Sequence, residues 1–336
     1  MTTREEMLKD IARPEYSFLK TNPHLGDNII LLGLGGSHAY GTDIATSDWD
    51  WRGVATRTAK DILTGKDFEQ VTNNVTDTTV YSFDKIIKLL CSCNPNTIEM
   101  LGLKPEHYLY VSPAGQLLLD NADLFLSKRA VNSFGGYAMA QLNRLSNKSG
   151  RANDEIVQNE ARSLQKAING LKLSDTTVSA KVEQCESSPL IILQGVWYLD
   201  DFVKLYQVVD NVHTDYRNST RNNKAVEHGK LNKHMMHLCR LYFMAIDILR
   251  DGKIVTYREK EHDFLMDIRN GKYLENGTTP TKEFMNIVAD MEKQMKDAAE
   301  KSELPDKPDQ DRVDALVADI NEAVITGGME EPQFEI

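Results

Sequence analysis

The sequence contains no apolar run of the roughly 18 to 20 residues that a helix needs to span a bilayer. Its first residues also lack the basic segment followed by an apolar segment that marks a secretion signal. These two absences indicate a cytoplasmic protein without a membrane partner. An apolar content of 41% excludes an extended disordered chain and is ample for a hydrophobic core.

Cysteine is scarce. The four cysteines include one Cys-x-Cys pair and no second closely spaced pair, which excludes a zinc cage and a disulfide framework. We therefore expect reduced, buried thiols at Cys91, Cys93, Cys185 and Cys239.

An excess of basic residues is missing as well. Lys and Arg total 39 against 50 Asp and Glu, so the net charge is −11. This balance argues against a nucleic-acid binder with a broadly basic surface, although it leaves a local basic pocket open.

The order of the sequence patterns predicts an α/β (α+β) head with a small mixed sheet, followed by a mainly α-helical domain. We place the head at residues 1–125, the helical domain at 126–325 and a polar tail at 326–336. Strands are expected at 28–34, 47–55, 75–81 and 98–101. Helices are expected at 83–90, 117–121, 131–145, 151–170, 190–210, 230–250, 281–301 and 311–325, with a loop at 174–189.

The sharpest chemical signal is Gly36-Ser37, followed after ten residues by Asp48-x-Asp50 and later by Asp77. A Gly-Ser turn offers backbone N–H groups and a hydroxyl to phosphate oxygens. Two carboxylates that alternate along a strand lie on one face, where they can hold the divalent metal that neutralises a triphosphate. A third carboxylate can act as base or as shared ligand.

Simpler interpretations of these residues stay open. Asp48 and Asp50 also suit a solvated edge strand or a turn, and Asp77 suits the turn that enters a strand. Glu69 and Glu99 are alternatives for the third carboxylate. Two other glycine motifs are excluded, because His38 stands where a dinucleotide fingerprint needs glycine and no Gly-Lys-Ser/Thr follows for a P-loop.

The blocks from Gly36 to Thr42 and from Ser47 to Val54 resemble the signature of the polymerase-beta-type nucleotidyltransferase superfamily. Within it, the chain is similar to the RNA-repair-pathway (RNA-ligase-associated) nucleotidyltransferases of phages and bacteria. Further similarities lie at residues 85–90, 94–99, 233–241, 268–271 and 302–309.

The resemblance implies that Gly36 and Ser37 bind the triphosphate, that Asp48 and Asp50 hold metal, and that Asp77 is the third carboxylate. Two Mg²⁺ ions, or Mn²⁺ in their place, are the implied cofactors. Trp49 and Trp51 depart from the family pattern, in which smaller or aliphatic residues are commoner. These tryptophans, together with Tyr40, suit either core packing or stacking on a nucleobase.

The predicted helices add a second group of candidates. Lys233, His237 and Arg240 are spaced i, i+4, i+7 on one helix, so they lie on one stripe and can converge on the phosphates of a nucleotide. Tyr137, Gln141 and Arg144 have the same spacing on an earlier helix. Ordinary solvated helix faces are the alternative for both stripes.

The sequence therefore predicts a magnesium-dependent nucleotidyltransferase that moves a nucleoside monophosphate from a nucleoside triphosphate to an acceptor hydroxyl and releases pyrophosphate. The family resemblance suggests RNA, such as a tRNA end, as acceptor. A protein AMP-transferase and a nucleotide-binding protein without enzymatic activity are the alternatives. The patterns do not indicate an oligomeric state.

Overall fold

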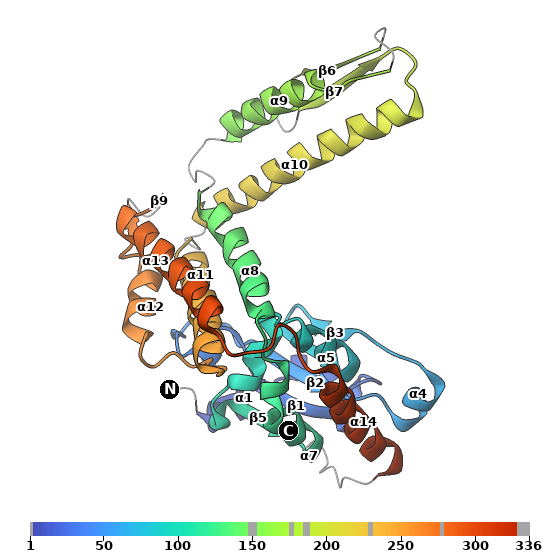
Figure 1. The fold of residues 1–336 in the computed structure, drawn as a ribbon, viewed down its shortest axis with the longest axis vertical. Helices are drawn as coiled ribbons and strands as arrows, with labels where there is room; N and C mark the ends of the chain where they lie inside the picture. The colour runs from blue at the N-terminus through green and yellow to red at the C-terminus, as the bar shows by residue number, and fades with distance from the viewer. Residues whose placement is uncertain are drawn as a thin grey trace. The chain divides into compact units, whose positions relative to one another are not determined.

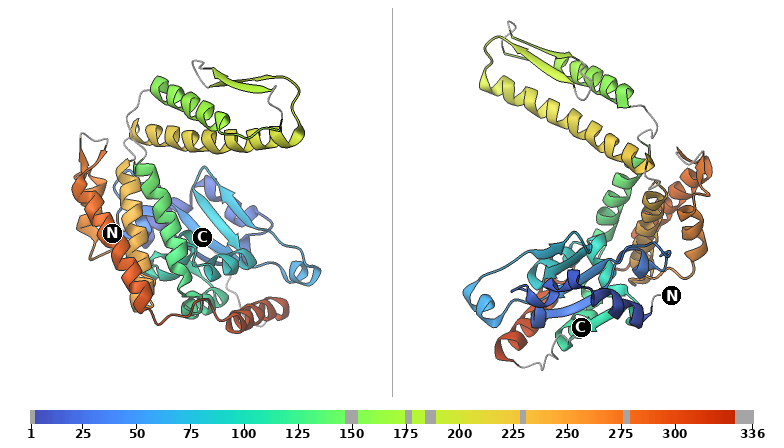
Figure 2. Two further views of the ribbon diagram at one scale, coloured as in Figure 1. Left: turned by 45° about the horizontal axis from the view of Figure 1, so that its top comes forward. Right: turned by 180° about the vertical axis from the view of Figure 1, so that it is seen from behind.

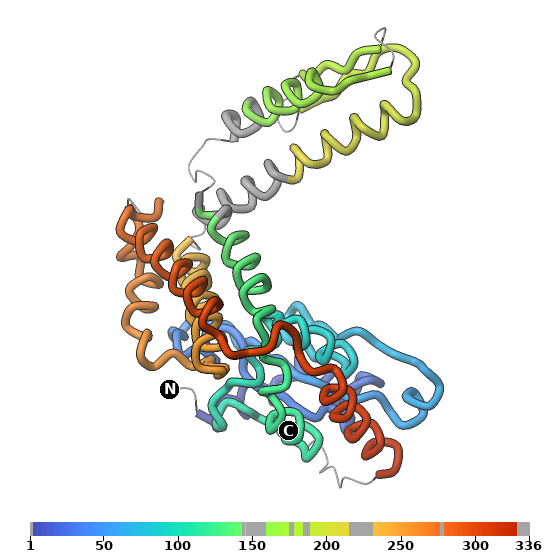
Figure 3. Tube along the Cα trace, in the orientation of Figure 1, coloured from blue at the N-terminus to red at the C-terminus, as the bar shows by residue number. Residues whose placement is uncertain are grey.

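The computed structural model describes residues 3–146, 153–174, 178–183, 189–227, 231–275 and 279–327. The chain forms two compact units that interleave along the sequence. One unit comprises Met1–Met139, His237–Asp267 and Asn286–Ile336, and the other comprises Ala140–Met236 and Ile268–Met285. Figure 3 traces how the first unit combines the beginning of the chain with its end. The domain boundaries that we expect at residues 125 and 325 stay predictions.

The helices carry the labels of Figure 1. They are α1 (Arg4–Ile11), α2 (Phe18–Thr21), α3 (Gly36–Tyr40), α4 (Ala59–Thr64), α5 (Phe83–Cys91), α6 (Pro95–Ile98), α7 (Pro113–Asp120), α8 (Arg129–Ser146), α9 (Asn153–Asn169), α10 (Leu199–Glu227), α11 (Leu231–Asp251), α12 (His262–Arg269), α13 (Lys282–Lys301) and α14 (Gln310–Thr326). Short 3₁₀ helices are η1 (Pro14–Tyr16), η2 (Gly26–Asn28), η3 (Glu99–Gly102), η4 (Pro105–His107) and η5 (Ala122–Phe125).

A five-stranded sheet in the order β3-β4-β2-β1-β5 lies in the first unit (Figure 1). Its strands are β1 (Ile29–Leu34), β2 (Trp51–Ala55), β3 (Gln70–Asn73), β4 (Thr78–Ser82) and β5 (Tyr108–Val111). The β2–β4 pair is parallel and the other pairs are antiparallel. The expected small mixed sheet is therefore confirmed, while the order of a head followed by a helical domain stays a prediction.

Local sequence explains the central elements. Every residue of β1 is buried, as its apolar run predicts. The Ser82 hydroxyl accepts the Lys85 N–H at 3.1 Å and caps α5, whose apolar residues recur at helical spacing and are buried. At the other end of the chain, α14 packs against α4 and α7, so the C-terminal helix belongs to the unit that carries the sheet (Figure 2).

Several predicted elements differ from the structure. The acidic strand begins at Trp51 and not at residue 47, and strands β3 and β5 are not among the predicted strands. Residues 98–101 are helical and not a strand, because the Asn94 side chain caps α6 and Pro95 occupies its first turn. The predicted helix at 190–210 is wrong over its first part, where Leu190–Gln194 forms β7.

In the second unit, α9 packs against α10 and against a hairpin of β6 (Ser179–Glu183) and β7. A shorter hairpin pairs β8 (Leu274–Glu275) with β9 (Thr279–Pro280). The β6–β7 hairpin lies within the region predicted to be a loop and the start of a helix.

The expectation of buried thiols is confirmed for Cys93 and Cys239, while Cys91 is half-buried. All three are free cysteines. Cys185 lies outside the described residues.

Candidate functional site

After the buried strand β1 and the connecting Gly35, Gly36 and Ser37 form the start of the five-residue helix α3. Gly36 has φ of +55°, in the left-handed region that favours glycine. Ser37 is half-buried, and its carbonyl accepts the Thr42 N–H at 2.9 Å. The sequence motif therefore forms the predicted strand-turn-helix.

Asp50 lies directly against this turn. The Gly35 N–H donates to the Asp50 carbonyl at 2.7 Å, which extends the pairing of β1 with β2 by one residue. A Cβ atom at Gly36 would lie 1.6 Å from Asp50 Oδ2. Glycine is thus required at position 36 both by its φ angle and by the neighbouring carboxylate, and the fold brings Gly36 and Asp50 together.

Asp77 lies at the same edge of the sheet, directly before strand β4. It lies in the turn before β4 with φ of +43°, so the strand-entry interpretation of this residue is confirmed. The parallel register pairs Trp51 with Thr78, which places the two preceding residues, Asp50 and Asp77, next to each other.

Arg52 links these two aspartates. Its guanidinium lies 3.3 Å from Asp77 Oδ1 and 3.9 Å from Asp50 Oδ1, and it also donates to the Asp77 carbonyl oxygen. A further bond runs to the Trp51 carbonyl at 2.9 Å. The sequence alternation puts Arg52 on the acidic face of the strand but assigns it no role. Its position two residues after Asp50 is the signal that points to this contact.

The three aspartates differ in exposure. The Asp50 side chain is 18% exposed and that of Asp77 is 66% exposed, while Asp48 is an exposed residue. Burial raises the pKa of the Asp50 carboxyl to about 7. Its hydrogen bond with Asp77 and the charges of Asp77 and Asp48 also raise that pKa, whereas Arg52 lowers it. A nearby cation therefore favours the ionised form of the Asp50 carboxyl.

A divalent cation fits this donor set. Mg²⁺ usually takes one or two protein carboxylates and completes its shell with water and substrate phosphates. Asp50 and Asp77 supply such carboxylates beside the Gly36–Ser37 turn. In the described part of the chain, no three His, Cys, Asp or Glu side chains form a ready-made cage for a metal ion. The arrangement therefore suits a cation that arrives with phosphate oxygens.

The aromatic residues of the motif are mostly packed. The Trp51 side chain is fully buried, and its indole N–H donates to Asp10 Oδ2 at 3.0 Å. Trp49 is half-buried and stacks on the buried His38 ring, with centroids 4.3 Å apart. Trp51 and the buried Tyr40 therefore belong to the core, while Trp49 contacts α3 through His38.

Glu69 and Glu99 lie in different surroundings. The Glu69 side chain is 73% exposed and pairs with Lys85. The Glu99 side chain is 14% exposed and accepts the Tyr40 hydroxyl at 2.6 Å. Asp77 is thus the carboxylate that the fold places beside Asp50, and its assignment as the third carboxylate stays a prediction.

The two helical stripes are only partly described. Arg240 is buried, with its guanidinium carbon 3.2 Å from the Tyr40 ring centroid, and His237 is half-buried. Lys233 is exposed and belongs to the second unit. A nucleotide-binding role for these three residues stays a prediction.

In the earlier stripe, the Asn94 amide donates to the Tyr137 hydroxyl at 3.3 Å. Gln141 is buried, and the side chain of Arg144 lies outside the described residues. Convergence of this stripe on phosphates therefore stays a prediction.

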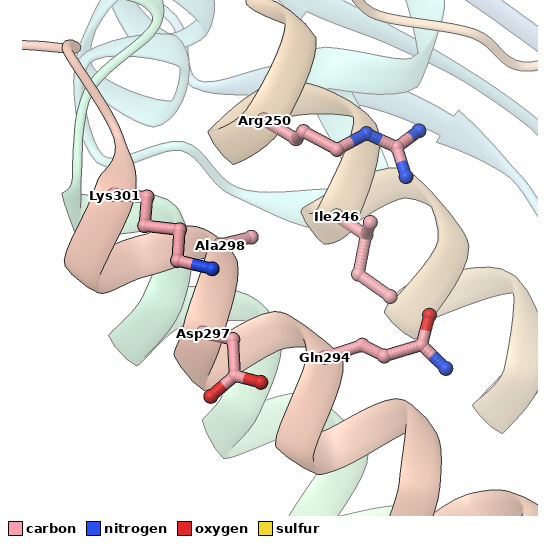
Figure 4. A pocket seen from close by; sticks show the side chains of 6 residues that line it. All are labelled: Ile246, Arg250, Gln294, Asp297, Ala298 and Lys301. Atoms are coloured by element: carbon pink, nitrogen blue, oxygen red, sulfur yellow. The ribbon is translucent and has the colours of Figure 1, made fainter.

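A separate groove of about 230 Å³ lies between α11 and α13 (Figure 4). It is lined by Ile246, Arg250, Gln294, Asp297, Ala298 and Lys301. None of the predicted site residues contributes to its lining.

Comparison with known proteins supports the resemblance seen in the motifs. The model of the RNA repair pathway DNA polymerase beta family (RlaP) matches residues 4–319. The chain is also 23% identical over 318 residues to a protein of Enterobacteria phage T4, described as an uncharacterized 38.9 kDa protein in the nrdC-mobD intergenic region. That alignment covers 82% of this chain and 91% of the phage protein. No solved structure matches. None of the helices within the described ranges is long and apolar enough to cross a membrane.

Proposed function

Because the chain belongs to the RNA repair pathway DNA polymerase beta family, we propose that it transfers a nucleoside monophosphate from a nucleoside triphosphate to an acceptor hydroxyl, with Mg²⁺ as cofactor. The observation that carries this proposal is the meeting of Gly36, Asp50 and Asp77 at one edge of the sheet. Nucleotidyl transfer needs carboxylates for metal next to a surface that phosphates can approach closely.

Each residue then has a definite task. Asp50, Asp77 and the exposed Asp48 would together hold the metal. When bound, the metal neutralises the charge that develops on the phosphates. Gly36 and Ser37 would contact the β and γ phosphates. Asp77 is also the residue that we expect to accept the proton of the attacking hydroxyl. Its side chain is 66% exposed and so accessible to an acceptor.

In the reaction, the acceptor oxygen attacks the α phosphorus and the bond from that phosphorus to the bridging oxygen breaks, so pyrophosphate leaves. The chain mainly positions the reactants and stabilises charge. Arg52 supports this role by fixing Asp77 next to Asp50. RNA is the acceptor that we propose, in keeping with the description of the family.

Transfer of label from α-labelled ATP, CTP, GTP and UTP into the RNA and protein fractions of a cell extract tests the proposal. Wild type is compared with Asp50→Asn and with Asp263→Asn, a matched control at a fully exposed side chain of the same unit. We expect metal-dependent labelling of RNA that is retained in the control and lost in Asp50→Asn.

Two other results would change the conclusion. Label in the protein fraction would identify a protein acceptor and support an AMP-transferase. Equal labelling by wild type and Asp50→Asn, or none by either with all four nucleotides, would overturn the proposed chemistry.

A further inference from the structure

A buried polar network lies at the C-terminal end of α3. Tyr40, the last residue of α3, donates its hydroxyl to Glu99 Oε2 at 2.6 Å. Arg240 Nη2 lies 4.0 Å from the same oxygen, and its guanidinium covers the Tyr40 ring with 3.2 Å from carbon to centroid. The three residues come from α3, η3 and α11, which are far apart in the sequence and belong to one compact unit.

The backbone around this network is held as well. The segment after α11 donates the Arg258 N–H to the Tyr40 carbonyl at 3.2 Å. From the same segment, the Thr256 hydroxyl donates to the Glu99 carbonyl at 2.7 Å. Both the side chain and the carbonyl of Tyr40 are therefore fixed by residues far along the chain.

Ordinary stabilisation is a poor explanation for such a network. The Arg240 side chain is 9% exposed and that of Glu99 is 14% exposed, so both charged groups have lost most of their water. A buried ion pair often contributes no more stability than well-packed apolar residues, because desolvation offsets the attraction. The 4.0 Å separation is also long for a strong pair.

Position offers a better explanation. Tyr40 lies four residues after Gly36, about 6 Å along the helix at the usual rise per residue. A helix of one turn cannot flex much between its ends, so an anchor at Tyr40 also fixes the backbone of Gly36 and Ser37. Gly41, directly after the anchor, has no room for a Cβ atom, which would lie 2.4 Å from the Tyr257 ring.

We propose that Tyr40, Glu99 and Arg240 are positioning residues that hold the Gly36–Ser37 turn in place for the triphosphate. Arg240 thereby contributes to triphosphate binding without contacting the nucleotide. This inference rests on the proposed function, because it assumes that the turn contacts phosphate. It gives Arg240 an indirect role in place of a direct phosphate contact.

Binding measurements on the full chain separate positioning from folding. The probes are inorganic tripolyphosphate with Mn²⁺ for the turn, and Mn²⁺ alone, detected by electron paramagnetic resonance, for the carboxylates. The variants are Tyr40→Phe, Glu99→Gln and the double variant. Arg250→Gln is the control for a polar substitution outside the network, because it changes a 59% exposed arginine on α11.

We expect Tyr40→Phe and Glu99→Gln to weaken tripolyphosphate binding about five- to tenfold, since losing an anchor of about 1 kcal/mol lets the turn leave its binding geometry. The double variant should be no weaker than the more affected single variant, because both changes act on one bond. Affinity for Mn²⁺ alone should stay close to that of the control, and a fall of a few degrees in the melting temperature should leave the chain folded at the temperature of the assay. In the transfer assay, KM for the nucleotide should rise more than kcat falls.

Unchanged tripolyphosphate affinity in Tyr40→Phe would overturn the inference, as would an equal loss of Mn²⁺ and tripolyphosphate affinity. If Glu99→Gln does not fold, Tyr40→Phe decides alone, because it removes one hydroxyl and keeps the ring. Failure of the proposed function is a distinct outcome, in which wild type itself neither binds tripolyphosphate nor transfers label.

Discussion

Replacing Gly36 with alanine would place a methyl group in the space of the Asp50 carboxylate. The new Cβ atom would lie 1.6 Å from Oδ2 and 2.6 Å from Cγ of Asp50. Rotation of the carboxyl group alone cannot relieve both contacts, so the whole side chain must move. Oδ2 has to retreat by at least about 1.4 Å to reach the shortest separation of 3.0 Å that real Cβ atoms tolerate.

The expected loss of activity is much larger than the loss of stability. A displacement of about 1 Å of a reacting or positioning group can cost roughly a hundredfold in rate. We therefore expect Gly36→Ala to lower kcat by about a hundredfold or more. The left-handed backbone adds a strain of about 1–2 kcal/mol for any residue with a Cβ atom. Such a strain lowers the melting temperature of a protein of this size by several degrees.

Gly65→Ala is the control that isolates the steric clash. Gly65 ends α4 with φ of +67°, close to the +55° of Gly36, but a Cβ atom added there would meet nothing within 4 Å. Thermal melts should show destabilisation of both variants, larger in Gly36→Ala because of the clash, whereas only Gly36→Ala should lose Mn²⁺ affinity and transfer. Equal activity of the two variants would refute the argument that the position of the Asp50 carboxylate depends on the absence of a Cβ atom at Gly36.

Three further predictions concern the same sheet edge and its support. Without metal, the pKa of Asp50 is about 7 in the folded chain and 3.8 in the unfolded chain, so protonation favours the folded state. The stability that this protonation adds should be complete below pH 3.8 and should be lost as the pH rises through about 7. Urea unfolding between these pH values in the presence of a chelator measures the free energy of unfolding, which should depend less on pH in Asp50→Asn than in wild type. Arg52→Gln should release Asp77 and weaken Mn²⁺ binding about tenfold, with only partial recovery in Arg52→Lys, which lacks the planar fork. Asp10→Ala should cost about 2–4 kcal/mol in urea unfolding, because the Trp51 N–H and the Tyr16 hydroxyl lose their acceptor; an unchanged midpoint would contradict it.

Local patterns are enough to predict part of this site. The apolar run of β1, the glycine turn and the following aspartates are all close together in the sequence, so their spacing carries the information. The predicted start of the acidic strand is too early, because alternation alone does not show where pairing begins. The strand predicted at 98–101 is wrong because the side-chain cap of Asn94 and the fixed φ angle of Pro95 favour a helix.

Contacts between distant segments cannot be predicted in this way. Asp77 meets Asp50 only through the parallel register of β2 and β4, which no single-sequence pattern specifies. Tyr40 and Glu99 are 59 residues apart, and Arg240 lies much further along the chain. Their contact depends on the return of α11 to the first unit. In the sequence, Arg240 therefore resembles one member of a helical stripe, although its partners lie on α3 and η3.

The interleaving of the two units also determines how the protein is made. The first unit is interrupted after Met139 by about a hundred residues of the second, before His237 continues it. At ribosomal rates of about 5–20 residues per second, the interruption alone lasts on the order of 5–20 seconds. During that interval the nascent sheet and α3 are exposed without α11, and α14 emerges later still. A nascent chain in this state presents unburied apolar surface, so its yield in the cell should depend on chaperone capacity more than its folded stability suggests.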